Sequence, residues 1–133
     1  MIGSLNIHSF ARFFLVSVFA LGLPVASAFA HSQLVKAEPP RRAVLTKSPT
    51  QVRLWFNENI EGDYASLVIL DDKKQPISDE RPTLAPDDPK SIVLSVPELA
   101  PGKYSVKFRV LSVDGHVVES SYDFSIKGGA QEK

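Results

Sequence analysis

Three residues of this chain have the types and spacing to bind one metal ion: Asp114, His116 and the distant His31. Asp114 and His116 are two positions apart, and side chains at i and i+2 point to the same side of an extended chain. One metal ion could therefore bind both. The alternative interpretation is that Asp114-Gly115, between two apolar-alternating runs, marks a β-hairpin turn.

Residues 1–30 are typical of a secretory signal peptide. Arg12 is their only Lys, Arg, Asp or Glu, Phe13 to Leu23 forms an apolar run, and Ala28-Phe29-Ala30 fits the small-x-small cleavage rule. The apolar run has about 11 residues, whereas a transmembrane helix needs about 20. We therefore expect export to the periplasm, removal of this segment and no stable membrane insertion afterwards.

The cleavage position decides the chemistry of His31. We expect cleavage after Ala30, which makes His31 the N-terminal residue, whereas cleavage after Ala28 would leave Phe29 first. An N-terminal histidine offers its α-amine and its Nδ1, which close a six-membered chelate on one metal ion. The amine has an ordinary pKa of about 7.7 to 8.0, so a Lewis acid readily deprotonates it.

The composition restricts any metal site to nitrogen and oxygen ligands. The chain has no Cys, its only Met is Met1, and His8 lies in the predicted signal peptide. Thiolate sites and disulfides are therefore excluded. Together, His31, His116 and Asp114 supply three nitrogens and one carboxylate oxygen, a set that suits tetragonal Cu(II) and would hold zinc less tightly.

The charge balance gives no sign of an anionic partner. Loss of Arg12 with the signal peptide leaves 14 basic and 15 acidic residues, a net charge of −1. We therefore expect no nucleic-acid binding, because the chain has no basic field. About 100 mature residues form a single domain. We expect this domain to span residues 31–127 as a monomer and to end in a flexible, polar tail at residues 128–133.

Alternating apolar residues predict β-strands throughout the mature chain. The expected strands are Leu34 to Ala37, Gln51 to Phe56, Tyr64 to Leu70, a short edge strand within Gln75 to Leu84, Ser91 to Val96, Lys103 to Val110 and Val118 to Ile126. Residues 41–49 are expected to be a connection, and residues 85–89 a loop. Tyr104 follows a Pro-Gly turn, where immunoglobulin-like sandwiches place a tyrosine corner. About seven strands predict an all-β Greek-key sandwich or barrel.

Several short motifs resemble one known family. They are His31-x-x-Leu34-Val35, Leu54-x-Phe56-x-Glu58, Leu99-x-Pro101-Gly102-x-Tyr104, Val110-x-Ser112-x-Asp114-Gly115-His116 and Phe124-x-Ile126. Across nearly the whole mature chain, this pattern resembles the CopC family of periplasmic copper-binding (copper resistance) proteins. The resemblance implies a β-barrel of the cupredoxin or immunoglobulin-like type. It also implies a Cu(II) site made by the His31 amine and imidazole, Asp114 and His116.

The resemblance also places Glu58 near the proposed site. Its alternative interpretation is an exposed acid that follows a strand. Some members of the family carry a Met-rich loop that binds Cu(I), but this chain has only Met1. We therefore expect one Cu(II) per chain and no Cu(I) site, since Cu(I) prefers sulfur ligands.

The leading functional hypothesis is a periplasmic protein of copper homeostasis or resistance, which sequesters Cu(II) or delivers it to a membrane partner. The resemblance implies a CopD-type inner-membrane copper transporter as that partner. One alternative is an enzyme resembling the copper mono-oxygenases that use an N-terminal histidine. We expect no enzyme, because Asp114 would occupy the in-plane position at which oxygen must bind. The other alternative is a metal-free immunoglobulin-like interaction module.

Overall fold

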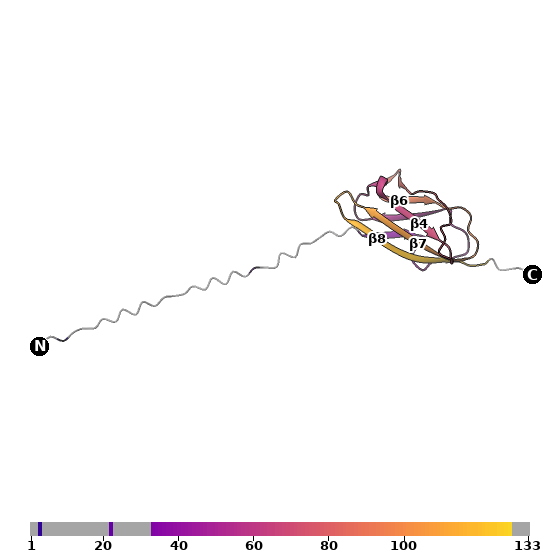
Figure 1. Ribbon diagram of the computed structural model, residues 1–133, viewed down its shortest axis with the longest axis horizontal. Coiled ribbons are helices and arrows are strands. Elements are labelled where there is room, and N and C mark those ends of the chain that lie inside the picture. The colour runs from indigo at the N-terminus through magenta and orange to yellow at the C-terminus, as the bar shows by residue number, and fades with distance from the viewer. Residues whose placement is uncertain (1–2, 4–21, 23–32, 129–133) are drawn as a thin grey trace, which may run out of the picture.

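The computed structural model describes Gly3, Gly22 and residues 33–128. The rest of the predicted signal peptide, His31, Ser32 and residues 129–133 lie outside the described residues. The described chain forms two four-stranded sheets that pack face to face (Figure 1). The strands are β1 (Leu34–Glu38), β2 (Val44–Leu45), β3 (Gln51–Phe56), β4 (Ser66–Leu70), β5 (Thr83–Ala85), β6 (Asp88–Ser95), β7 (Gly102–Leu111) and β8 (Val117–Ile126), with one 3₁₀ turn, η1 (Gly62–Tyr64).

The strand order confirms the predicted all-β Greek-key architecture. Sheet A has the order β1-β3-β6-β5 and sheet B the order β2-β8-β7-β4, so the first five strands alternate between the sheets. Neighbouring strands are antiparallel except for β2 and β8, which run parallel. No helix within the described residues is long and apolar enough to cross a bilayer.

The structure has eight strands where about seven were expected. The additional strand, β2, lies inside residues 41–49, because a two-residue strand is too short to show alternation. The expected loop at residues 85–89 is a two-residue turn, at Pro86 and Asp87, within a β5–β6 hairpin. The η1 turn occupies Gly62–Tyr64, so β4 begins at Ser66 rather than at Tyr64.

The core follows the alternation of the sequence. The inward residues of β3, Val52, Leu54 and Phe56, are at most 2% exposed. Phe56 of sheet A meets Phe108 of sheet B edge to face, with ring centroids 5.8 Å apart. Burial of each such side chain contributes about 1.5 to 3 kcal/mol. The core thus joins the two sheets through ordinary apolar packing.

The predicted tyrosine corner is present at the start of β7. The hydroxyl of Tyr104 donates a hydrogen bond to the carbonyl of Ala100, 2.6 Å away. The Tyr104 ring stacks on Phe124 of β8, with centroids 5.6 Å apart. Burial raises the pKa of Tyr104, so the hydroxyl keeps its proton at neutral pH. The corner therefore fixes the loop that leads into the longest hairpin of the fold.

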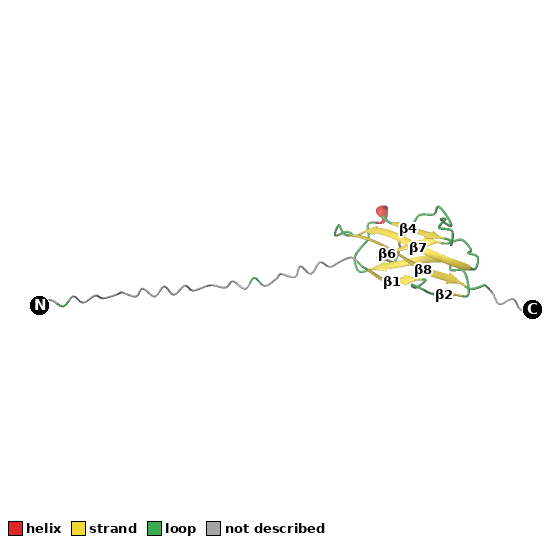
Figure 2. Cartoon of the chain, turned by 60° about the horizontal axis from the view of Figure 1, so that its bottom comes forward, coloured by secondary structure: helices red, strands yellow, loops and turns green. Residues whose placement is uncertain are grey.

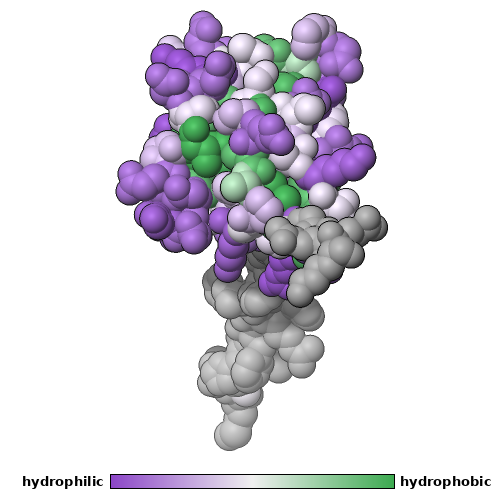
Figure 3. All heavy atoms as spheres, turned by 90° about the vertical axis from the view of Figure 1, so that its right-hand side faces the viewer, coloured by the Kyte–Doolittle hydropathy of each residue, from purple (hydrophilic) through white to green (hydrophobic). Residues whose placement is uncertain are grey.

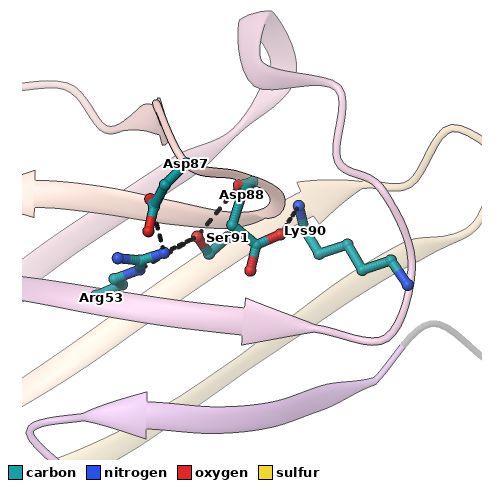
Figure 4. A network of polar contacts seen from close by, with 5 residues as sticks. All are labelled: Arg53, Asp87, Asp88, Lys90 and Ser91. Atoms are coloured by element: carbon teal, nitrogen blue, oxygen red, sulfur yellow. Dashed lines mark hydrogen bonds and ion pairs between the residues drawn. The ribbon is translucent and has the colours of Figure 1, made fainter.

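The outer face of sheet A carries a polar network around Arg53 (Figure 4). The guanidinium donates to the hydroxyl of the fully buried Ser91, at 2.9 and 3.2 Å, and to Asp87 at 3.1 Å. Trp55, the only tryptophan of the chain, lies between Arg53 and Lys36, whose charged groups are 4.6 and 4.5 Å from its ring centroid. Its indole is therefore held in place near the C-terminal end of β3.

At the end of the sandwich where β8 finishes, apolar surface is surrounded by hydrophilic residues (Figure 3). A hollow of about 570 Å³ lies here. Its apolar lining includes Val96, Leu99 and Ile126, and its rim includes Lys47 and Lys127. We call this the far end, because β8 runs towards it from the loop that carries Asp114 and His116.

Candidate metal centre

The connection between β7 and β8 positions Asp114 and His116. The Ser112 backbone N–H donates to the carbonyl of His116 at 2.8 Å, and the Gly115 N–H donates to the carbonyl of Ser112 at 2.9 Å. Gly115 has a φ of 93°, in the left-handed region that favours glycine. The expectation of an extended Asp-x-His segment is therefore wrong, and the alternative interpretation, a hairpin turn at Asp114-Gly115, is confirmed.

The turn nevertheless brings the two side chains together. Oδ2 of Asp114 lies 3.0 Å from Nδ1 of His116, and the side chains are 35% and 42% exposed. Two ligands at right angles, each about 2.0 to 2.1 Å from one ion, would be about 2.9 Å apart. The observed separation thus fits two adjacent positions on one metal ion. Both side chains are partly exposed, although the His116 Nδ1 atom itself is buried.

Ser112 holds this pair in place. Its hydroxyl, on a residue that is 1% exposed, donates to Oδ1 of Asp114 and accepts from the backbone N–H of His116 at 3.2 Å. Hydrogen bonds from Ser112 and then from His116 hold the pKa of the Asp114 carboxyl below its ordinary value. The Asp114 carboxyl is therefore ionised over a wide pH range.

The sequence contains a signal for the role of Ser112. Ser112 continues the inward-facing series Val106, Phe108 and Val110 of β7. A hydroxyl in a series of buried apolar residues needs a hydrogen-bond partner. The nearest polar side chain along the chain is that of Asp114.

Two other segments meet the β7–β8 connection at the same end of the sandwich (Figure 2). The Val113 N–H donates to the carbonyl of Asn59, in the loop after β3, at 2.9 Å. That loop also holds the start of β1, because the Asn57 N–H donates to the Gln33 carbonyl at 3.1 Å and the Gln33 N–H donates to Oδ1 of Asn57 at 2.7 Å. We call this the metal end of the molecule.

The remaining predicted ligands are not brought together within the described residues. Glu58 is partly exposed in the loop after β3. No group of three or more His, Asp or Glu side chains in the described part of the chain is close enough to hold a metal ion. Glu58 thus does not complete such a group with Asp114 and His116. His31 lies outside the described residues, so the four-donor set remains a prediction.

The fold and the pair define a small Greek-key sandwich with a carboxylate–imidazole pair on a loop at one end. The family model described as the CopC domain matches residues 34–127. The chain therefore belongs to the CopC family, and the resemblance seen in the sequence is confirmed.

Named relatives and a solved structure agree with this assignment. Copper resistance protein C of Xanthomonas campestris pv. juglandis is 31% identical over 118 residues, which cover 84% of this chain and 92% of that protein. The crystal structure of CopC from Methylosinus trichosporium OB3b is 40% identical, covers 77% of this chain and 99% of its own, and has a TM-score of 0.71. Copper transport protein CutJ of Bacillus subtilis is 26% identical over 82% of this chain, but only 20% of CutJ is matched.

Proposed function

We propose that this protein is an exported copper-binding protein that holds one Cu(II) through the amine and imidazole of His31 together with Asp114 and His116. The observation that carries the proposal is the Asp114–His116 pair, 3.0 Å apart and held by Ser112. A carboxylate and an imidazole are ligands that Cu(II) accepts, and Cu(II) is at the top of the divalent affinity order. The copper-related names of the relatives support this choice of metal.

Chain length supports the participation of His31. His31 is two residues before Gln33, and two residues span at most about 7 Å. Gln33 is hydrogen-bonded to Asn57 in the loop after β3. The same loop is hydrogen-bonded to Val113, beside the proposed ligands. The N-terminal chelate would thus start from the end of the sandwich that carries Asp114 and His116.

The proposal includes the processing and location of the chain. Residues 1–30 would be removed as a signal peptide, residues 31–127 would form the copper-binding domain, and residues 128–133 would be a flexible tail. The protein would act in the periplasm as a monomer. With no Cys and no Met beyond Met1, reduction to Cu(I) would weaken binding, because no sulfur ligand is available to the reduced ion.

We further propose that the bound copper is delivered to a membrane transport protein of the CopD type. A region similar to this chain makes up one fifth of CutJ, whose name assigns it to copper transport. Such a domain therefore occurs within a longer protein named for copper transport. An enzymatic role is not proposed, because the carboxylate of Asp114 would occupy a position needed by oxygen.

The decisive experiment changes only the N-terminal amine. A protein that starts at His31 is compared with one carrying a single alanine before His31, which keeps every side chain but converts the amine to an amide. We expect the extended protein to lose Cu(II) affinity by several orders of magnitude, because an amide is neither basic nor placed to chelate. Competition with a chromophoric chelator measures the affinity.

The matched control carries the additional alanine after Lys133, and we expect it to bind copper as the unextended protein does. His31→Ala should be as damaging as the N-terminal extension, His116→Ala less so, and Asp114→Asn least, because an amide oxygen can still approach the metal. Equal affinities for the two N-terminal forms would contradict the proposed ligand set. N-terminal sequencing of the exported protein tests the cleavage after Ala30 independently.

A further inference from the structure

We propose that the metal end is a docking face for a copper-exchanging protein partner that presents basic residues around an apolar centre. The docking face is defined by Glu58, Glu61, Asp63, Val113 and Val117. This inference rests on the proposed function, since it concerns the partner with which copper is exchanged. Two independent features of the metal end carry it, the sign of its charge and its exposed valines.

Several acidic side chains lie at the metal end of the fold. Residues 54–72 and 110–126 contain no Lys or Arg. They supply the acids of the metal end, of which Glu61 and Asp63 are exposed and Glu58 is partly exposed. Within the described residues, none of these three acids forms a salt bridge, whereas Glu119 is paired with Arg109 at 3.6 Å. Lys90 also lies at this end, because the preceding Pro89 carbonyl accepts from the Ile60 N–H at 3.0 Å, but no salt bridge joins Lys90 to any of these three acids. Glu58, Glu61 and Asp63 outnumber this lysine, so the metal end keeps an excess of negative charge.

The backbone fixes these acids beside the proposed ligands. The Glu61 N–H donates to the carbonyl of Leu111 at 2.9 Å, and Ile60 forms a β-bridge with Ser112. The η1 turn that follows is thus held against the end of β7. The backbone that carries Glu61 and Asp63 therefore lies beside the end of β7, close in sequence to the Asp114–His116 pair.

Exposed apolar side chains are concentrated at the same end. Val113 and Val117, which flank the Asp114–His116 pair, are 59% and 50% exposed. Of the five large apolar residues that are exposed in the described chain, four belong to segments of the metal end, and only Val44 lies at the far end. Single exposed valines are ordinary, so these residues support the proposal only in combination with the acids at the same end.

These features together specify the chemistry of the partner. A basic rim would be attracted by the acids, and an apolar centre would cover the valines, as in interfaces with a polar rim and an apolar core. An anionic lipid surface would be repelled by the same acids. A second copy of this chain could offer the basic residues of its far end, such as Lys47 and Lys127, so self-association is an outcome that the test must separate.

The test uses two donor peptides with the same acetylated His-Gly-His copper-binding core, flanked either by alternating Lys and Leu or by alternating Glu and Leu. Each Cu(II)-loaded peptide is mixed with the apo protein, and Trp55 fluorescence quenching follows copper arrival. We expect the basic donor to transfer copper at least about tenfold faster at low salt, because opposite charges accelerate encounter. The difference should disappear at high salt.

Charge variants show which end of the molecule causes the preference for the basic donor peptide. The double variant Glu61→Lys/Asp63→Lys should abolish the preference for the basic donor peptide. The control Asp72→Lys/Glu98→Lys makes the same change of net charge beside far-end pockets, and it should preserve that preference. Val113→Ser/Val117→Ser should slow transfer from the basic donor, and Val44→Ser, which alters an equally exposed valine about 26 Å away along β8, should not. All variants should retain the equilibrium copper affinity of the parent protein.

Each outcome has a distinct meaning. Failure of the apo protein to take copper from either peptide would overturn the proposed function. Normal binding with equal rates for the two donors would overturn the docking face alone, as would equal responses of the metal-end and far-end variants. Sedimentation that shows salt-sensitive self-association, lost in either set of charge variants, would replace the partner with a second copy and would also overturn the proposal.

Discussion

Ser112→Ala should weaken copper binding without altering any proposed ligand. The substitution removes the hydroxyl that donates to Oδ1 of Asp114 and accepts from the backbone N–H of His116. The two hydrogen bonds of the backbone turn, from Ser112 to His116 and from Gly115 to Ser112, remain. Alanine also adds no volume at this buried position. The variant therefore tests positioning of the ligands and leaves the ligands themselves in place.

The expected loss of copper affinity depends on the hydrogen-bond donors that Asp114 keeps. After loss of the hydroxyl, Oδ1 of Asp114 keeps the backbone N–H of His116, at 3.2 Å, as its donor. Removal of a group that orients a metal ligand typically lowers affinity by about 10- to 100-fold. Because one donor remains and water can reach a carboxylate that is 35% exposed, we expect the lower value, about tenfold.

The same strand provides a matched control. Ser105 donates to Oδ1 of Asp123 at 2.7 Å, which repeats the Ser-to-Asp hydrogen bond about 23 Å from Ser112. Ser105→Ala should leave copper affinity unchanged. Chelator competition at fixed pH and salt measures both variants, with thermal melts of the apo proteins alongside. Wild-type copper affinity in a folded Ser112→Ala protein would refute the positioning role.

Three further predictions concern stability. Tyr104→Phe removes the hydrogen bond to the Ala100 carbonyl, so we expect a loss of about 1 kcal/mol and a melting temperature lower by about 4 to 8 °C, measured by circular dichroism. Hydrogen bonds from the Ser105 hydroxyl, and then from Lys103, lower the pKa of Asp123 in the folded protein. The ionised carboxylate therefore stabilises the fold at pH values above the ordinary pKa of Asp. This stabilisation is lost as the pH falls through the lowered pKa of the folded state. Asp123→Asn should therefore destabilise the protein at pH 7 and have little effect near pH 2, in urea titrations at both pH values. Chelation of copper should leave the far-UV circular dichroism spectrum unchanged and lower the melting temperature. The melting temperature falls because the binding free energy is lost, about 2.7 kcal/mol at free metal 100 times the Kd. Collapse of the β signal would contradict this expectation.

The fold was predictable wherever strands are long enough to alternate. Gln51–Phe56 has buried residues at every second position, and Gly102–Leu111 repeats the pattern over ten residues. The two-residue β2 has no pattern of its own, since it depends on parallel pairing with Ser125 and Ile126, about 80 residues later. Such pairing is a property of the assembled sandwich, so local sequence could not indicate it.

The candidate site was predictable in its residues and not in its local geometry. Asp114 and His116 were selected by type and spacing, and they do lie together. Their approach results from a turn around Gly115, whereas side-chain alternation assumed an extended chain. The support from Ser112 depends on a hydroxyl that turns back towards its own loop, a contact that a one-dimensional pattern does not contain.

We expect folding and the proposed copper binding to depend on different groups of this chain. At the metal end, backbone hydrogen bonds from Asn57 to Gln33 and from Val113 to Asn59 fix the segments that carry or precede the proposed ligands. These bonds need no metal, so we expect Asp114 and His116, the proposed ligands within the described residues, to be arranged before copper binds. This differs from small zinc domains, in which metal binding drives folding. His116→Ala should therefore lose copper and keep its apo melting temperature, whereas Tyr104→Phe, a change of the far-end corner, should lower the melting temperature and keep its copper affinity. If either variant changed both quantities together, folding and metal binding would be coupled and the preformed site would be wrong.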